Sequence, residues 1–219
     1  DLLIPRGGKG LIQSMVENAT VPYILDGDGN VHLYIHEDAD ADKVNKIVIN
    51  AKVQRPGVCN ALETLIIHNK YIEQNGSKII DELLANGVEI FIDEVLSLEY
   101  PNCRVATEDE YYMEFHDYKI AIKIVDNLDE AIEHINIYSS GHTESILTKD
   151  EDAAEKFSNS IDSSVVFINA STRFTDGEIF GFGAEIGIST QKLHVRGPMG
   201  LEALTSERYI VKGDGQIRE

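Results

Sequence analysis

Short apolar segments alternate with amphipathic helical segments along most of this chain. Residues 64–67 and 165–168 are mostly apolar, as buried strands are, and residues 120–124 alternate with period two. Residues 38–52 and 128–135 repeat apolar side chains at helical spacing. Helices of this length between strands imply parallel pairing, so the pattern predicts an α/β fold with a mostly parallel sheet covered by helices. The same patterns predict strands at 88–92 and 145–147 and helices at 79–84 and 153–157.

The chain is strongly acidic, with 38 Asp and Glu residues against 19 Lys and Arg residues, and a net charge of −19. Such a field repels nucleic acid and anionic membranes, which are bound through clustered basic residues. No apolar run approaches the roughly 20 residues that cross a bilayer. The start, residues 1–6, resembles no signal peptide and lacks an initiator Met, which indicates a truncated or processed chain. We therefore expect a cytoplasmic protein that binds neither nucleic acid nor membrane.

Four stretches of this acidic chain contain no Asp or Glu: residues 2–16, 51–62, 164–175 and 186–201. Each stretch contains at least one Lys or Arg. Chance in apolar or glycine-rich segments explains any one of them. If the four stretches meet in space, they predict a place where an anion binds.

Cys59 is the candidate nucleophile because of its sequence neighbourhood. It follows a Pro56-Gly57 turn, with Lys52 and Arg55 close by and no acid between them. Positive neighbours lower the pKa of a thiol and raise its thiolate fraction, and the thiolate is the nucleophile. The alternative is a small buried apolar side chain, and the sequence leaves both open. Cys103 lacks such a context, so we expect a structural thiol there.

The motifs for metal and nucleotide binding are absent or weak. His32 and His36 lie in a predicted strand, where their side chains are too far apart to chelate a metal easily. Residues 7–10, Gly-Gly-Lys-Gly, follow an apolar strand and precede a helix. Such a turn can cradle phosphate, but it matches no dinucleotide or Walker motif and is explained more simply as a tight turn. Glycine is frequent after residue 176, as in a flexible-backbone loop or in a backbone that approaches a ligand.

Five segments of the chain share their motifs with one known family: residues 3–8, 54–65, 169–177, 180–185 and 189–202. Together they resemble the γ-glutamyl phosphate reductases, a family of the aldehyde dehydrogenase superfamily. They occur in the family's order over essentially the full length, and the last two are long and specific. The resemblance extends to the reductase half of the pyrroline-5-carboxylate synthases.

The resemblance implies an aldehyde dehydrogenase-like catalytic domain with a remnant of the cofactor-binding domain. Residues 1–35 correspond to that remnant, and residues 36–185 to the thiol-bearing catalytic domain. Residues 186–219 correspond to a substrate loop and a C-terminal segment with a role in oligomerisation. Family members are roughly twice as long, so we expect the second half of such an enzyme, a homo-oligomer that binds NADPH poorly as a separate chain.

The activity implied by the resemblance is NADPH-dependent reduction of γ-glutamyl phosphate to glutamate-5-semialdehyde, with release of phosphate, in proline biosynthesis. The substrate would be channelled from glutamate 5-kinase. Cys59 would form a thioester, which divides one difficult step into two easier ones, and its backbone N–H would stabilise the oxyanion. Hydrolytic relatives carry a general-base Glu upstream of the cysteine. Residues 24–30 lack that motif, so Asp26 and Asp28 are not expected to be catalytic.

The remaining site residues follow from the resemblance, and each basic one has a surface or structural ion pair as its alternative. Arg173 is favoured because it follows a predicted strand, and ligands gather at the carboxyl ends of strands in parallel sheets. Two other functions compete: a non-catalytic assembly domain without cofactor binding, and a Cys-dependent hydrolase or acyltransferase with a His beside Cys59. The predicted substrate or phosphate ligands are Arg55, Asn60, Ser171, Thr172, Arg173, Lys192, His194 and Arg196; the predicted NADP ligands are Arg6, Gly7 and Gly8; no metal is expected.

Overall fold

A computed structural model describes residues 2–26, 28–193 and 195–219, and its centre is a seven-stranded parallel sheet. The strand order is β4-β3-β5-β2-β1-β6-β7, and a separate antiparallel pair joins β8 to β9. The predicted α/β class and parallel pairing are confirmed. The strands are β1 (Val31–Ile35), β2 (Leu62–His68), β3 (Glu89–Ile92), β4 (Arg104–Val105), β5 (Lys119–Val125), β6 (Thr143–Leu147), β7 (Val165–Ile168), β8 (Ile188–Ser189) and β9 (Gly197–Pro198).

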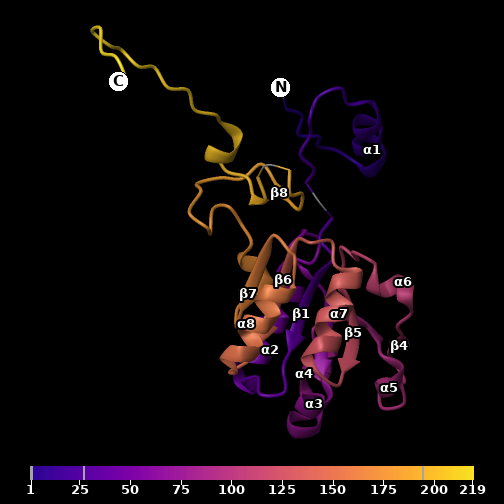
Figure 1. The fold of residues 1–219 in the computed structure, drawn as a ribbon. Helices are drawn as coiled ribbons and strands as arrows, with labels where there is room; N and C mark the ends of the chain where they lie inside the picture. The colour runs from indigo at the N-terminus through magenta and orange to yellow at the C-terminus, as the bar shows by residue number, and fades with distance from the viewer. Residues whose placement is uncertain (1, 27, 194) are drawn as a thin grey trace.

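Helices cover both faces of the sheet, with α7 and α8 on the face toward the viewer in Figure 1 and α2 and α4 on the other. All the helices predicted from periodicity are present. The helices are α1 (Lys9–Asn18), α2 (Ala41–Val53), α3 (Asn69–Asn75), α4 (Lys78–Ala85), α5 (Glu94–Ser97), α6 (Glu108–Tyr111), α7 (Leu128–Tyr138) and α8 (Glu151–Ser160), with 3₁₀ turns at Thr172–Phe174 and Glu202–Leu204.

The two cores follow from the alternation of side chains along each strand. Leu33 and Ile35 of β1 pack with Val48 of α2 and Leu83 of α4 in the larger core. Tyr34, between them in sequence, points to the opposite face and packs in the second core, beneath α7 and α8. Successive strand residues point to opposite faces, so a sheet covered on both sides needs continuous apolar runs. This requirement explains why the strands were recognisable in the sequence.

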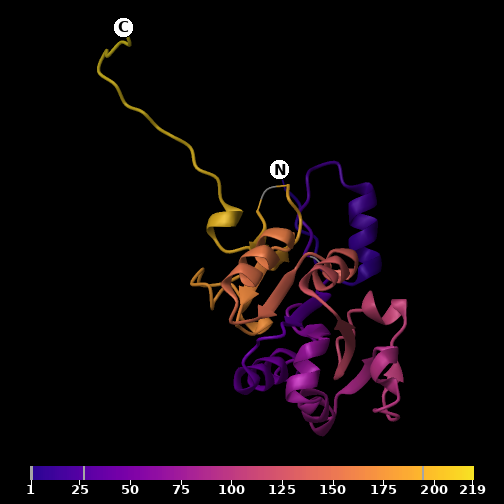
Figure 2. The same ribbon diagram turned by 60° about the horizontal axis from the view of Figure 1, so that its bottom comes forward.

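The amino ends of the strands form one edge of the sheet, and the N-terminal segment and the β8–β9 region lie beyond that edge (Figure 1). The strand expected before residue 7 is wrong, because Leu3 makes only an isolated bridge to Tyr23. Pro5, which has no N–H to donate, stands where further pairing would follow. The last residues extend away from the sheet in both views (Figures 1 and 2). The division of the chain at residues 35 and 185 stays a prediction, although β1 is itself a central strand.

Two buried histidines make the stability of the fold depend on pH. Burial lowers the pKa of His134 from 6.5 to about 3 and that of His142 to about 4. Both folded pKa values lie below the unfolded value, so the unfolded chain binds protons first as the pH falls. Their contribution to stability is therefore complete above pH 6.5 and is lost progressively toward pH 4.

We expect replacement of His134 by Gln to flatten this pH dependence. Between pH 6.5 and pH 4 the variant should lose about 3 kcal/mol less unfolding free energy than the parent chain. Urea unfolding at the two pH values measures the difference. A His116→Gln control, at an exposed side chain, should keep the parent's slope. Parallel pH curves for the parent and the His134 variant would show that this histidine is not held neutral by burial.

Candidate active site

Cys59 lies in the loop 54–61, which joins the end of α2 to the start of β2 at the amino edge of the sheet. The predicted bend is confirmed: α2 ends at Val53, and Pro56 and Gly57 form a turn. The loop closes through a hydrogen bond from the Ala61 N–H to the Val58 carbonyl (2.9 Å). The thiol is therefore presented from a turn next to a central strand.

Gly29 packs directly against the backbone of Cys59. A Cβ atom added to Gly29 would lie 1.8 Å from the Cys59 carbonyl oxygen and 2.5 Å from its Cα. Only glycine leaves room for this approach, at a point two residues before β1 begins. Sequence reasoning missed Gly29, because Asp-Gly-Asp-Gly indicates a turn without showing what packs against it.

The segment 171–175 is tied to the residue that follows Cys59. The Asn60 amide donates to the Thr175 carbonyl (2.7 Å), and the Thr172 hydroxyl donates to the Asn60 carbonyl (2.8 Å). Ser171 is buried, and its hydroxyl accepts from the Arg173 N–H (3.3 Å). These three residues are predicted substrate ligands, and here their side chains join two protein segments.

The path of this segment corrects the expectation that candidate residues gather at the carboxyl ends of the strands. Asn169 does lie at the end of β7, where it bonds to the backbone of Thr148 (2.8 and 2.9 Å). The chain then turns back along β6: the Ala170 carbonyl accepts from Ser145, and the Thr175 hydroxyl accepts from Thr143 at the start of that strand. The returning segment therefore brings the residues that follow β7 to the amino edge.

Arg173 is held near the thiol by a residue that sequence reasoning missed. Its Nε donates to the Gln54 side chain (2.9 Å), one residue beyond α2. Partial burial and then the charge of Arg55 lower the pKa of Arg173, while the Cys59 thiol raises it. Arg173, Arg55 and Cys59 thus interact electrostatically within one site.

The pKa of the Cys59 thiol is raised to about 12, mainly by burial and then by Asp26, Glu114 and Glu185. The sequence-based expectation of a lowered pKa is wrong. The ammonium group of Lys52 is bound to Glu63 instead (2.7 Å), and both side chains are fully buried. The acids that surround the thiol come from distant parts of the chain. The structure therefore holds the thiol protonated at neutral pH.

The remaining predicted basic ligands form ion pairs elsewhere. Arg196 and Lys192 both pair with Asp162, the former at 2.9 Å. Arg6 pairs with Asp26 (2.6 Å) and also donates to the Ile186 carbonyl. The acid-free stretches therefore meet in two places, 51–62 with 164–175 at Cys59, and 2–16 with 186–201 at Asp26. His194 lies outside the described residues.

Arg6, Gly7 and Gly8, the predicted cofactor ligands, do not fit a dinucleotide site by themselves. The Arg6 guanidinium is already occupied by Asp26 and Ile186. Gly8 is the N-cap of α1 and has no side chain that could bind the free N–H groups of the first turn. These N–H groups could bind one phosphate at most. Within the described ranges, no group of three or more His, Cys, Asp or Glu residues could hold a metal ion.

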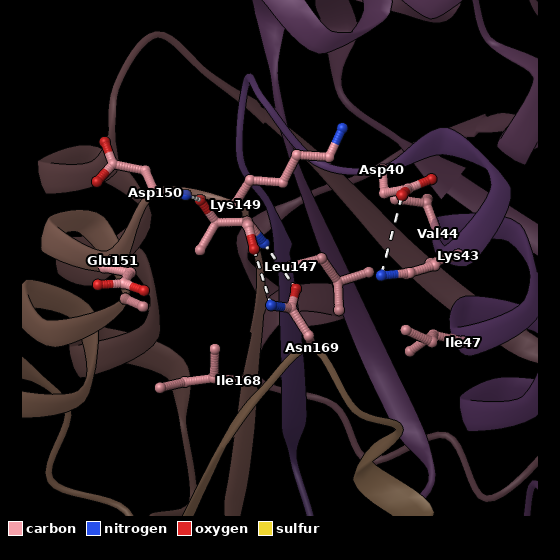
Figure 3. A pocket seen from close by; sticks show the side chains of 12 residues that line it. Asp40, Lys43, Val44, Ile47, Leu147, Lys149, Asp150, Glu151, Ile168 and Asn169 are labelled. Atoms are coloured by element: carbon pink, nitrogen blue, oxygen red, sulfur yellow. Dashed lines mark hydrogen bonds and ion pairs between the residues drawn. The ribbon is translucent and has the colours of Figure 1, made fainter.

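Two cavities of the described chain lie away from Cys59. One of about 310 Å³ lies at the carboxyl edge of the sheet, between α2 and α8 (Figure 3). Figure 3 shows Asp40 and Lys43 on one side of it and Asp150 and Glu151 on the other. The second, of about 820 Å³, is lined by residues around β9 and by Phe180 and Phe182. Neither cavity is lined by Cys59.

Comparison with known proteins identifies the superfamily whose fold this chain shares. The family model "Aldehyde dehydrogenase family" matches residues 120–204. An acetylating aldehyde dehydrogenase from Geobacillus thermoglucosidasius shares the fold, with a TM-score of 0.74 at 18% identity over all of this chain and 58% of that one. The parallel sheet therefore has the fold of the aldehyde dehydrogenase superfamily.

Relatives with higher sequence identity indicate a particular family within this superfamily. A γ-glutamyl phosphate reductase from Carboxydothermus hydrogenoformans is 55% identical over all of this chain and 52% of its own length. The crystal structure of γ-glutamyl phosphate reductase from Thermotoga maritima has a TM-score of 0.92 at 52% identity, over all of this chain and 53% of that one. Within the superfamily, the chain is thus similar over its whole length to γ-glutamyl phosphate reductases. It spans about half the length of these relatives.

In the part of the chain that the structure describes, none of the helices is both long enough and apolar enough to span a bilayer. The cytoplasmic location stays a prediction.

Proposed function

We propose that this chain provides the nucleophile of an NADPH-dependent enzyme that reduces γ-glutamyl phosphate to glutamate-5-semialdehyde, releasing phosphate, in proline biosynthesis. The observation that supports this most directly is the meeting of Cys59 with Arg173 and Arg55, from two distant segments, at one edge of the sheet. Relatives that are more than half identical over the whole chain carry the name of this activity.

In the proposed reaction, Cys59 Sγ attacks the acyl carbon of γ-glutamyl phosphate. A carbon–sulfur bond forms, the bond to the phosphate oxygen breaks, and the thiol proton passes to the departing phosphate. The backbone N–H of Cys59 is our candidate donor to the oxyanion. Similarity to the aldehyde dehydrogenase family and to these reductases implies a nicotinamide cofactor, which would supply the hydride that reduces the thioester to the aldehyde.

Arg173 compensates for the unfavourable surroundings of the thiol in this proposal. Burial and three acids disfavour the thiolate, and a guanidinium next to it offsets part of this effect. The same guanidinium can bind a phosphate through two parallel hydrogen bonds. Gln54 fixes one of its nitrogens and leaves the others for the substrate.

Replacing Arg173 by Met in the full-length polypeptide that contains this sequence should lower kcat/KM by about 100-fold. The assay follows NADP reduction in the reverse direction, with glutamate-5-semialdehyde and phosphate. Lys192→Met is the matched control, since Lys192 pairs with Asp162 on the surface and should change the rate by less than about threefold. An Arg173→Met enzyme as active as the parent would refute the assigned role, and an inactive parent would refute the proposed function.

The assembly alternative also has an observation in its favour. Tyr209, Ile210 and Val211 are 88%, 71% and 90% exposed on the extended C-terminal segment. Exposed apolar side chains in a row favour contact with another chain, so we propose that the protein forms homo-oligomers. Light scattering tests the association, and NADPH titration of the chain tests whether it binds the cofactor at all.

A further inference from the structure

The two ends of the Cys59 loop are joined by a buried ion pair. Lys52 lies in the last turn of α2, and Glu63 is the second residue of β2. Their side chains meet at 2.7 Å, and both are fully buried. The pair therefore connects the two ends of the loop that contains Cys59.

A contribution to the folding stability does not explain why this ion pair is buried. Burying two charges costs about as much as their attraction returns, and apolar residues of similar size often serve equally well. Glu63 Oε1, moreover, is buried without a hydrogen-bond partner among the described residues. Burial raises the pKa of Glu63 to about 7 and lowers that of Lys52. A costly pair at this position points to a role in fixing geometry.

The pair also acts on the groups that do the proposed chemistry. Gln54, which holds Arg173, lies two residues beyond Lys52, at the start of the loop that contains Cys59. Glu114 interacts electrostatically with Lys52, with Glu63 and with the Cys59 thiol. Lys52 therefore offsets the charges of Glu63 and of Glu114, and Glu114 is one of the acids that raise the pKa of the thiol. Displacement of Lys52 would move the thiol loop and remove a positive charge that acts on Glu114.

We propose that Lys52 and Glu63 are a positioning pair for Cys59, which fixes the base of loop 54–61 and so sets the placement of the thiol and of the Gln54–Arg173 contact. The role of Cys59 as nucleophile is taken from the proposed function. The placement of the loop is a property of the chain itself and can be measured without turnover.

The test compares two variants of the full-length polypeptide. The double variant Lys52→Met with Glu63→Leu replaces the pair by apolar side chains, and Glu63→Gln keeps the hydrogen bond without the second charge. Each is examined by thermal unfolding, by kcat and KM, and by the rate of Cys59 alkylation with iodoacetamide at about pH 8. Mass spectrometry quantifies alkylation, with Cys103 as an internal reference.

The double variant should unfold near the parent's temperature, yet its kcat should fall at least about tenfold, with KM changed by less than about threefold. Its Cys59 should be alkylated at least about threefold more slowly, because a displaced loop would separate the thiol from the Arg173 guanidinium. Glu63→Gln should keep kcat and alkylation within about threefold of the parent.

Two results would overturn the positioning role. One is a folded double variant with the parent's kcat and alkylation rate. The other, decisive even if the double variant does not fold, is a folded Glu63→Gln protein whose kcat and Cys59 alkylation both fall at least about tenfold. If the parent has no reductase activity, the proposed function fails, while the alkylation rates still decide whether the pair positions the thiol.

Discussion

Replacing Cys59 by Ser in the full-length polypeptide should lower the reductase rate by about 10³-fold or more. A serine hydroxyl is a far weaker nucleophile than a thiolate, so it should accept the acyl group far more slowly. The substitution changes one atom of a half-buried side chain, so the protein should remain folded. Initial rates of NADP reduction, from glutamate-5-semialdehyde and phosphate, measure the loss.

Cys103→Ser is the control for this substitution. Cys103 is a partly buried thiol that packs against the larger core, far in sequence from the loop that carries Cys59. Its replacement should leave the rate within about twofold of the parent, as for a structural thiol. A Cys59→Ser enzyme that kept the parent's rate would show that the acyl group is never carried on this sulfur.

Replacing Gly29 by Ala should have the largest effect on the fold at this site. The new methyl group would overlap the Cys59 carbonyl at 1.8 Å, and its neighbours there are backbone atoms that cannot rotate away. Either β1 or the thiol loop must move, at a cost of about 3 kcal/mol or more. Any protein that still folds should lose at least about tenfold in rate, since small displacements of a reacting group are costly.

Urea unfolding measures the stability of Gly29→Ala. The control variant is Gly8→Ala, because Gly8 has free space around it. A Cβ at Gly8 would meet no atom within 4 Å, and its φ of −72° suits any residue. Gly8→Ala should therefore unfold at nearly the parent's urea concentration. Equal stability of the two variants would mean that Gly29 does not pack against Cys59.

The fold was predictable because its signals are local. The interior strands lie between two layers of helices and are apolar on both faces, and the long helices are apolar on one face. Residues 64–67 and 165–168 could therefore be predicted as strands from their apolar runs. The short helices α5 and α6 carry no such periodicity. The strand expected near Leu3 failed for a related reason: an apolar run predicts a strand only where a partner exists along its length.

The candidate site was predictable only in part, because its chemistry depends on contacts between distant segments. The Pro56-Gly57 turn placed the thiol correctly. The flanking Lys52 and Arg55 predicted a lowered thiol pKa, but the acids that raise it, Glu114 and Glu185, approach through the tertiary fold. The return of residues 169–175 along β6 has no signature in the sequence either.

The most direct test of the central claim is to trap the acyl group on the enzyme. The full-length polypeptide is incubated with glutamate-5-semialdehyde and NADP without phosphate, so that the proposed acyl acceptor is missing. Peptide mass spectrometry should then find a glutamyl group on Cys59, which disappears when phosphate is added. NADPH formation without any modification at Cys59, or with the glutamyl group on Cys103, would contradict the account.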